Sequence, residues 1–342
     1  MTNKSSHQTG LDNSWSIGID LGGTKIAVAM VDASGQVLEQ RRLATRVSEG
    51  PIAIQSEIVD AVLELRKYSV SKPVGVGIGV AGQIDPVSGT VRFAPNLDWR
   101  DVPIGNVLRN ALDMPVFVTN DVRAATWGEW VHGAGRECDD LVCLFVGTGV
   151  GGGVVSGGRM LAGCSNTAGE FGHITIDLHG PLCNCGNRGC LEALAGGWAI
   201  ARNAREMAEK DPEAGAALLR LANGRPERIT AHMVTIAYRE GDPIAAKIVG
   251  TATEALVAGA VSLINALNPC RLILGGGIIV GLPELVTLVD HGVHKRALAS
   301  ARIPLQVLPS RLGNDAGVIG AAIMAMRELT MDDPLQGPES TD

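Results

Sequence analysis

The chain of 342 residues is poor in aromatic side chains, which make up 3% of it, and in charged side chains, which make up 19%. Its apolar stretches, such as residues 141–155, are broken by glycine well short of the roughly 20 residues that cross a bilayer, so we expect a soluble protein. Residues 1–14 are polar and contain no apolar segment of the kind found in secretion signals. We therefore expect a disordered leader over 1–14, a polar tail over 329–342 and a cytoplasmic location.

An excess of positive charge is also absent. The chain has 29 Lys and Arg against 36 Asp and Glu, a formal net charge of −7, so no sequence-wide basic field exists to attract nucleic acid or anionic lipid. We expect neither a nucleic-acid partner nor a membrane partner. Hydrophobic residues reach 46%, which supplies a sizeable core and excludes an intrinsically disordered chain. The 44 glycines indicate backbone that bends tightly or approaches another group closely.

The hydrophobic pattern predicts an α/β protein with an internal duplication. Residues 15–43 form three β-rich runs separated by glycine-containing turns, followed by a helix over 52–68 and a strand over 73–82. A short helix near 103–112, a strand over 115–121 and a further helix come next. At Leu141 the opening pattern of strand, glycine-rich turn and strand returns, about 125 residues after the first copy, which is the separation of duplicated domains rather than of a solenoid. Residues 196–265 are mostly helical, and residues 313–329 form a closing helix.

The first glycine-rich turn contains Asp20, Gly22, Gly23, Thr24 and Lys25. Since it joins two strands, it is neither the strand-to-helix turn of a dinucleotide fold nor a P-loop. Adjacent glycines in a hairpin can point several backbone N–H groups at one anion, while Thr24 and Lys25 add a hydroxyl and a positive charge. Asp20, at the strand end, is suited to holding Mg²⁺ through water. The alternative is an ordinary tight hairpin.

Two further glycine clusters strengthen the interpretation as a nucleotide site. Gly147, Thr148 and Gly149 occupy the equivalent turn of the second copy, and two facing hairpins can hold a polyphosphate from both sides. Gly275, Gly276 and Gly277 follow a strand and leave backbone bare where a purine could lie; simple strand-to-helix turning is the alternative.

Asn120 and Asp121 end an apolar strand and open a helix. A carboxylate there stands beside the helix's N–H groups and can accept a proton from an alcohol during phosphoryl transfer. The simpler alternative is that one of the two only caps the helix. Arg123, which follows, contacts phosphate or faces solvent, and we leave it unassigned.

A cysteine cluster gives the clearest chemical signal. Seven cysteines, an odd number in a chain without an export signal, argue against a disulfide framework. His173, Cys183, Cys185 and Cys190 offer one imidazole and three thiols, with intervening glycines, which is the ligand set of a tetrahedral structural Zn²⁺ site. Buried free thiols are the alternative. The other four cysteines, at positions 138, 143, 164 and 270, are expected to be small core residues.

Several of these stretches together carry a resemblance to a known family. DLGGTK, the run from VGTGVGGGVV through AGEFGH, CNCGNRGC followed by LE, and LGGGI occur in this order. The chain between Ser16 and Arg327 resembles the ROK family of sugar kinases and sugar-responsive repressors, within the actin-like ATPase superfamily. APNLDWRDVP and NDVRAATWGEW are most similar to the ATP-dependent glucokinases of that family. Val122 and Arg123 depart from the usual pattern, in which small or amide residues are commoner.

The resemblance implies a duplicated actin-like (ribonuclease H-like) fold with two lobes around a cleft. Residues 15–134, completed by a C-terminal helix at 313–328, would form the small lobe, and residues 135–312 the large lobe with the zinc knuckle and the ATP site. It implies a homodimeric enzyme that uses ATP, Mg²⁺ and a structural Zn²⁺ to phosphorylate the 6-hydroxyl of glucose, with Asp121 as the base. The sugar would be held by Asn96, Asn120, Asp121, Glu170, His173 and Glu192.

Three alternatives stay open at this point. The sugar can be another hexose, namely N-acetylmannosamine, N-acetylglucosamine or fructose, and polyphosphate is a weaker candidate as donor. A sugar-sensing repressor is disfavoured, because only about fifteen residues precede the first strand and a DNA-recognition helix does not fit there. The tryptophans at 99, 127, 130 and 198 are either sugar platforms or core residues, and none is assigned.

Overall fold

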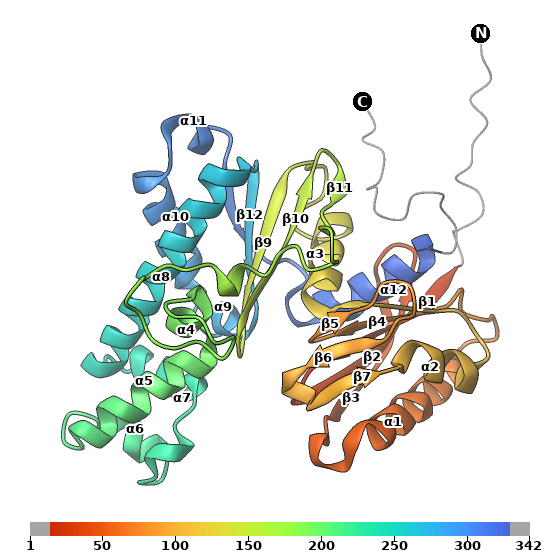
Figure 1. The fold of residues 1–342 in the computed structure, drawn as a ribbon, viewed down its shortest axis with the longest axis horizontal. Coiled ribbons are helices and arrows are strands. Elements are labelled where there is room, and N and C mark those ends of the chain that lie inside the picture. Colours follow the sequence, from red (N-terminus) through yellow and green to blue (C-terminus); the bar gives the residue numbers. More distant parts are fainter. Residues whose placement is uncertain (1–13, 329–342) are drawn as a thin grey trace. The chain divides into compact units, whose positions relative to one another are not determined.

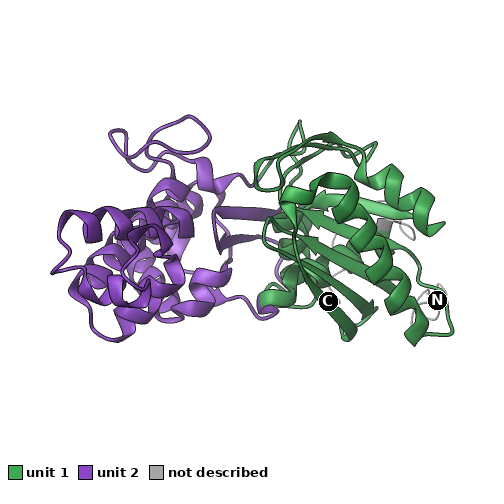
Figure 2. Ribbon diagram, turned by 90° about the horizontal axis from the view of Figure 1, so that it is seen from below, with its two compact units in different colours: residues 1–137, 158–168, 314–342 green, residues 138–157, 169–313 purple. Residues whose placement is uncertain are grey.

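The computed structural model describes residues 14–328. The predicted leader, apart from Ser14, and the predicted tail lie outside this range. The chain forms two compact units, coloured separately in Figure 2. Unit 1 comprises Met1–Glu137, Gly158–Ala168 and Asn314–Asp342, and unit 2 comprises Cys138–Gly157 and Gly169–Gly313.

Unit 1 is built on a five-stranded sheet with the order β3-β2-β1-β4-β8. These strands are β1 (Trp15–Leu21), β2 (Lys25–Asp32), β3 (Val37–Ala44), β4 (Val76–Val80) and β8 (Val116–Asn120). A second sheet has the order β5-β6-β7, from β5 (Gln83–Ile84), β6 (Val91–Ala94) and β7 (Trp99–Val102). The unit also contains α1 (Gly50–Leu65), α2 (Ile104–Leu112), α3 (Asp121–Val131), β11 (Arg159–Met160) and α12 (Ala316–Glu328). Helices α1 and α2 cover one face of the main sheet, and α12 covers the other (Figure 1).

The contact between α12 and the sheet requires glycine in the strands. A Cβ atom at Gly18 in β1 would lie 1.8 Å from the carbonyl oxygen of Val318, and one at Gly77 in β4 would lie 1.8 Å from that of Ala321. Both distances are far below van der Waals contact, so any side chain would push the helix off the sheet. This close approach lets a helix near the C-terminus pack on a sheet whose first strand begins at residue 15.

Unit 2 is built on a five-stranded sheet with the order β11-β10-β9-β12-β13, in which β11 is followed by β10 (Val150–Ser156), β9 (Leu141–Val146), β12 (Arg271–Gly275) and β13 (Gln306–Pro309). Its helices are α4 (Leu191–Ala195), α5 (Gly197–Lys210), α6 (Ala216–Leu221), α7 (Ala231–Arg239), α8 (Pro243–Leu267), α9 (Gly277–Gly281), α10 (Glu284–Arg296) and α11 (Ala299–Arg302). Helix α8 is the one described helix long and apolar enough, by composition, to cross a membrane. Much of it is buried against α4, α5, α7 and α10, as is usual for a core helix.

The two units repeat one topology, which confirms the predicted duplication. In unit 1, β2 pairs antiparallel with β1, which pairs parallel with β4, which pairs parallel with β8. In unit 2, β10 pairs antiparallel with β9, which pairs parallel with β12, which pairs parallel with β13. One segment differs from the expected lobe boundaries: Gly158–Ala168, expected in the large lobe, clusters with unit 1, while its strand β11 pairs with β10 in the second sheet. Side-chain contacts of Arg123, described below, hold the segment to unit 1.

Candidate functional site

The parallel strands of unit 1 bring its predicted residues to one edge of the sheet. Leu21 lies beside Val80, and Val80 lies beside Asn120, in the register of β1, β4 and β8. The turn after Leu21 and the pair Asn120–Asp121 therefore stand at the carboxyl ends of neighbouring strands, where open α/β sheets bind their ligands.

The β1–β2 hairpin packs against the loop that carries Asn96. The N–H of Gly22 donates to the carbonyl of Lys25 at 3.1 Å, and the Thr45 hydroxyl donates to the carbonyl of Gly22 at 2.7 Å. A Cβ at Gly23 would lie 2.6 Å from the carbonyl oxygen of Asn96, so only glycine allows this approach. Asn96 lies in a short 3-10 helix, Pro95–Leu97, and its side chain is exposed, as are those of Thr24 and Lys25. The hairpin thus offers exposed polar groups on a backbone that is held by its contacts with Thr45 and Asn96.

Asp20 lies at the base of this hairpin, against the first turn of α12. A Cβ at Gly317 would lie 2.9 Å from the Asp20 carboxyl carbon. Burial raises the pKa of Asp20 above its usual value of 3.8, and the positive charge of Lys25 acts in the opposite direction. A carboxylate whose charge is disfavoured by burial gains most from a cation beside it, so the residue fits the predicted Mg²⁺ role.

Asn120 caps helix α3, and Asp121 is the first residue of that helix. The Asn120 Oδ1 atom accepts from the backbone N–H groups of Val122 at 3.0 Å and Arg123 at 3.1 Å, while its Nδ2 donates to the carbonyl of Gly82 at 3.2 Å. The capping alternative is therefore true of Asn120. With the cap supplied by its neighbour, the carboxylate of Asp121, which is half-buried, is not required for capping.

In unit 2, the β9–β10 hairpin is held by Glu192. Its Oε2 accepts from the N–H of Val150 at 2.9 Å, and its Oε1 accepts from the indole N–H of Trp198 at 3.1 Å. A Cβ at Gly149 would lie 2.3 Å from Glu192 Oε2. Gly147 and the exposed Thr148 are held from below by backbone hydrogen bonds to α5: the N–H groups of residues 197 and 198 donate to their carbonyls at 2.9 and 3.0 Å.

The third glycine cluster is only partly open. The space beside Gly275 is filled by the ring of Phe145, 2.7 Å from where a Cβ would be, and that beside Gly276 by the backbone of Val146, at 2.5 Å. Gly276 also has φ +90°, a conformation that favours glycine. Strand packing and turning thus account for these two, whereas nothing lies within 4 Å of a Cβ at Gly277.

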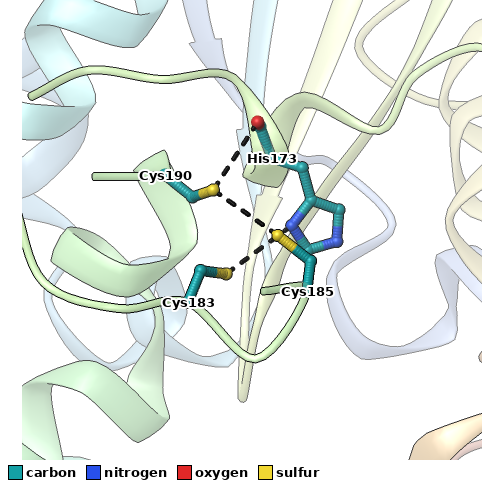
Figure 3. A group of neighbouring side chains, drawn as sticks. All are labelled: His173, Cys183, Cys185 and Cys190. Carbon is teal, nitrogen blue, oxygen red and sulfur yellow. Dashed lines mark hydrogen bonds between the residues drawn. The ribbon is translucent and has the colours of Figure 1, made fainter. Parts of the chain in front are cut away.

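The predicted metal ligands His173, Cys183, Cys185 and Cys190 converge (Figure 3). Their ligand atoms lie within 4.8 Å of one another. The Sγ atoms of Cys185 and Cys190 are 3.7 Å apart, and Cys183 Sγ is 3.8 Å from His173 Nδ1. Two sulfur atoms at the usual 2.3 Å from one tetrahedral Zn²⁺ lie about 3.8 Å apart, so the cluster fits zinc.

Electrostatics point the same way. Burial raises the pKa of the Cys183 thiol and, with its cysteine neighbours, raises that of Cys190 to about 12, whereas the backbone N–H of Asn187 lowers the pKa of Cys185. Without a cation, the environment of Cys183 and Cys190 favours the protonated thiol. A bound metal ion would displace those protons and supply the missing positive charge.

The segment before the cysteines places Glu170 and His173 next to the hairpin of unit 2. A Cβ at Gly172 would lie 2.0 Å from the carbonyl oxygen of Val150 and 3.3 Å from Glu192 Cβ, so this 3-10 turn, Phe171–His173, lies directly on β10. Glu170 Oε2 is 4.0 Å from His173 Nε2, the ring nitrogen opposite the cysteines. Glu170, His173 and Glu192 thus belong to one local cluster of acceptors and donors.

Comparison with known proteins identifies the family. The model described as "ROK family" matches residues 16–328 of the chain. The chain belongs to the ROK family. The glucokinase of Streptomyces coelicolor is 37% identical over 311 residues, which are 90% of this chain and 96% of that protein. The N-acetylmannosamine kinase of Escherichia fergusonii is 34% identical over 315 residues, which are 91% of this chain and 98% of that protein.

A solved structure of a ROK family glucokinase from Streptomyces griseus, in complex with glucose and AMPPNP, superposes with a TM-score of 0.81 at 36% identity. The match covers 92% of this chain and 99% of that one. Together with the repeated topology of the two units, this likeness gives the ROK chain the predicted actin-like ATPase fold.

Sequence reasoning about this ROK chain missed some residues and misplaced others. Arg123 is only 6% exposed and therefore does not face solvent; its guanidinium contacts Asn166. Cys164 and Cys270, expected in the core, are exposed. The tryptophans at 99, 127 and 130 are buried in unit 1, which excludes them as sugar platforms, while Trp198 packs beside the metal cluster.

Proposed function

We propose that the protein transfers the γ-phosphoryl group of ATP to the 6-hydroxyl of glucose, as a glucokinase of the cytoplasm. The observation that carries this proposal is the likeness to glucokinases over nine-tenths of the chain, including one solved with glucose and AMPPNP. The match to the ROK family model, residues 16–328, spans every motif from the β1–β2 hairpin to the glycines after β12.

Asp121 is the base in this proposal. Its carboxylate accepts the proton of the sugar 6-hydroxyl while that oxygen forms a bond to the γ-phosphorus and the bond to the ADP oxygen breaks. Support comes from its place at the start of α3, at the strand edge shared with the β1–β2 hairpin. Asn120 fixes the helix turn that carries it and uses its own side chain for the cap.

The two glycine hairpins bind phosphate groups in this proposal. The β1–β2 hairpin offers backbone N–H groups and a hydroxyl from Gly22, Gly23 and Thr24, and the positive charge of Lys25. The β9–β10 hairpin offers the same kinds of group from Gly147, Thr148 and Gly149.

The adenine would lie beside the third glycine cluster. The Cβ position of Gly277 is open, and together with Gly275 and Gly276 it would leave room for the ring. Mg²⁺ would be held by Asp20 through water and would neutralise charge on the phosphates.

Six polar side chains hold the sugar in this proposal: Asn96, Asn120, Asp121, Glu170, His173 and Glu192. Each is an acceptor or a donor that a sugar lacking the matching hydroxyl would leave unpaired, which is the basis of selectivity against such a sugar. Zn²⁺ on Cys183, Cys185, Cys190 and His173 Nδ1 would fix the His173 ring, so that its other nitrogen faces the sugar. We further propose that the enzyme works as a homodimer, following its family.

A second hexose remains a candidate because of one observation. The N-acetylmannosamine kinase noted above is nearly as similar to this chain as the glucokinases are. Both sugars carry the 6-hydroxyl that Asp121 would activate, and they differ in the substituent and configuration at carbon 2.

A coupled assay of ADP release with Mg-ATP decides between them. The panel is glucose, mannose, fructose, N-acetylglucosamine and N-acetylmannosamine, each compared by kcat/KM. We expect glucose to exceed every other sugar by at least about tenfold, the discrimination that one well-placed hydroxyl contact supplies. A preference for N-acetylmannosamine would replace glucose as the substrate, and no turnover with any sugar would overturn the kinase proposal.

A further inference from the structure

The chain places a buried arginine two residues after the proposed base. Arg123 lies in the first turn of α3, and its side chain is almost fully enclosed, with 6% of its surface exposed. Burying a guanidinium is costly unless its N–H groups find acceptors. Its acceptors therefore indicate what the residue holds in place.

The acceptors lie in one loop of unit 1. Nη1 of Arg123 donates to Asn166 Oδ1, and Nη2 donates to the carbonyl of Asn166 at 3.0 Å and to that of Ala162 at 3.4 Å. The loop closes on itself, since the N–H of Ala168 donates to the carbonyl of Ala162 at 3.0 Å. Arg123 thus binds the loop at two places, at Ala162 where the loop begins and at Asn166 in its turn.

Asn166 extends the grip to a third segment. Its Nδ2 donates to the carbonyl of Ile84 at 3.3 Å, and its backbone has φ +60°, a left-handed conformation that asparagine tolerates. Asn120 reaches the same segment from the other side, through its bond to the carbonyl of Gly82. The cap of α3, the Arg123 side chain and the loop thus form a closed set of hydrogen bonds around the turn that carries Asp121.

The loop comes directly before residues of the proposed sugar site. The segment Gly158–Ala168 belongs to unit 1, and the chain passes directly from it into unit 2 at Gly169. Glu170 and His173, both proposed sugar contacts, follow within five residues. Fixing the loop to α3 therefore fixes Ala168, the residue after which the chain enters unit 2 and reaches these two side chains.

We infer that Arg123 is a positioning residue, which anchors the loop 162–168 to the helix turn of Asp121 and so sets the start of the segment bearing Glu170 and His173. Resting on the proposed kinase function, this inference adds a residue whose effect is on sugar binding.

The test uses Arg123→Met, Arg123→Lys, Asn166→Gly and the double variant Arg123→Met/Asn166→Gly. Glycine suits the left-handed backbone at 166 and keeps the carbonyl there, so Asn166→Gly removes only the side chain. The matched control is Arg109→Met. Arg109, in α2, also binds backbone carbonyls of unit 1, those of Val116 at 3.2 Å and Ser88 at 3.1 Å, but it lies outside the loop.

For Arg123→Met we expect the KM for the sugar to rise by about 10- to 100-fold, the effect of misplacing a binding group by about 1 Å, while the KM for ATP changes less than about twofold. Asn166→Gly should raise the sugar KM in the same way, and the double variant should raise it by less than the product of the two single effects, since the two changes share the contact between Arg123 and Asn166 Oδ1. Arg123→Lys should recover part of the loss. The inference is overturned if Arg123→Met and Arg109→Met have the same kinetic effects, or if the effects of the two loop variants multiply.

Hydrogen exchange separates failure of this inference from failure of the kinase proposal. Amides of residues 162–168 should exchange at least about tenfold faster in Arg123→Met and in Asn166→Gly than in the wild type, and at the wild-type rate in Arg109→Met. This result needs no activity, so it stands even for a protein that phosphorylates no sugar. Unchanged exchange in both loop variants would show that Arg123 anchors nothing.

Discussion

Glu192 is a single side chain that serves two purposes in this protein. It holds the β9–β10 hairpin through Val150 and packs against Trp198, and it is also a proposed sugar contact. Each of its oxygens already accepts one hydrogen bond from a protein N–H. An isosteric amide in its place must turn an NH₂ group toward one of these two donors.

Glu192→Gln should therefore lower the free energy of unfolding by about 1–2 kcal/mol, because one bond to a charged acceptor is lost, and should raise the KM for the sugar. Thermal unfolding and steady-state kinetics measure both effects. Glu206→Gln is the control, since Glu206 is exposed and meets Arg202 at 3.7 Å on the surface of α5. Equal behaviour of the two variants would contradict the role given to Glu192.

Residues whose chemistry is local in sequence could be predicted, and those whose partners are distant could not. The four metal ligands lie within eighteen residues, and Asn120 and Asp121 are adjacent, so spacing alone indicates them. The contact of Arg123 is with a residue 43 positions away, and no local pattern marks it. Cys164 and Cys270 were expected in the core because cysteine is usually buried, but both lie in segments between strands or helices where little covers them.

The segment that carries the three clustered cysteines, residues 183–190, depends on glycine at two positions. Gly186 and Gly189 both have positive φ, +92° and +64°. A Cβ at Gly189 would lie 1.6 Å from the carbonyl oxygen of Asp177, whereas nothing lies within 4 Å of one at Gly186. Both positions have a backbone conformation that strains any other residue, but only Gly186 has room for a Cβ atom. They therefore form a matched pair for substitution by alanine.

Gly186→Ala should keep the metal and lose about 1–2 kcal/mol of stability from the left-handed backbone alone. Gly189→Ala should displace Cys190 and lose the metal. Metal analysis of the purified proteins should give about one Zn²⁺ per chain for the wild type and for Gly186→Ala, and far less for Gly189→Ala. A zinc-free wild type of full activity, or full zinc in Gly189→Ala, would refute the zinc assignment.

Helix α3 ends in a histidine that makes stability depend on pH. Burial lowers the pKa of His132 below its usual 6.5, as do Arg136 and Arg327, whereas Asp32 acts in the opposite direction. The ring lies against the turn after β2, where a Cβ at Gly35 would be 2.6 Å from its Cγ. Below pH 6.5 the unfolded chain takes up a proton that the folded chain refuses, so stability falls as the pH falls.

Replacing His132 by a ring that cannot take up a proton should remove its contribution to the pH dependence of stability. His132→Phe is expected to flatten the profile of unfolding free energy below about pH 6.5, while His291→Gln, at an exposed position of α10, keeps the wild-type slope. Urea unfolding at several pH values measures it. An unchanged slope in His132→Phe would assign the acid sensitivity to other groups.

At the scale of elements, periodicity and turn residues predicted the strands and most helices, since each is encoded by its own stretch of sequence. The packing of α12 could not be read this way. It depends on Gly18 and Gly77, which in the sequence look like ordinary strand residues and whose purpose appears only when the helix lies on them.

The whole molecule repeats one sheet topology in two units, and the sequence revealed this because both copies kept their glycine hairpins. The sequence did not reveal that Gly158–Ala168, whose strand β11 pairs in the second sheet, makes its other contacts with unit 1. Its place follows from long-range hydrogen bonds of Arg123 and Asn166, which hydrophobic patterns do not record.

The central claim is that the carboxylate of Asp121 removes the proton from the sugar hydroxyl. The most direct measurement is kcat for glucose with Mg-ATP in the wild type and in Asp121→Asn, together with glucose affinity by calorimetry. Asparagine keeps the shape and the hydrogen-bonding reach of the side chain but cannot take the proton. We predict that kcat falls by about 10²- to 10⁴-fold while glucose affinity and thermal stability stay close to the wild type. An Asp121→Asn enzyme with near-normal kcat would contradict the account.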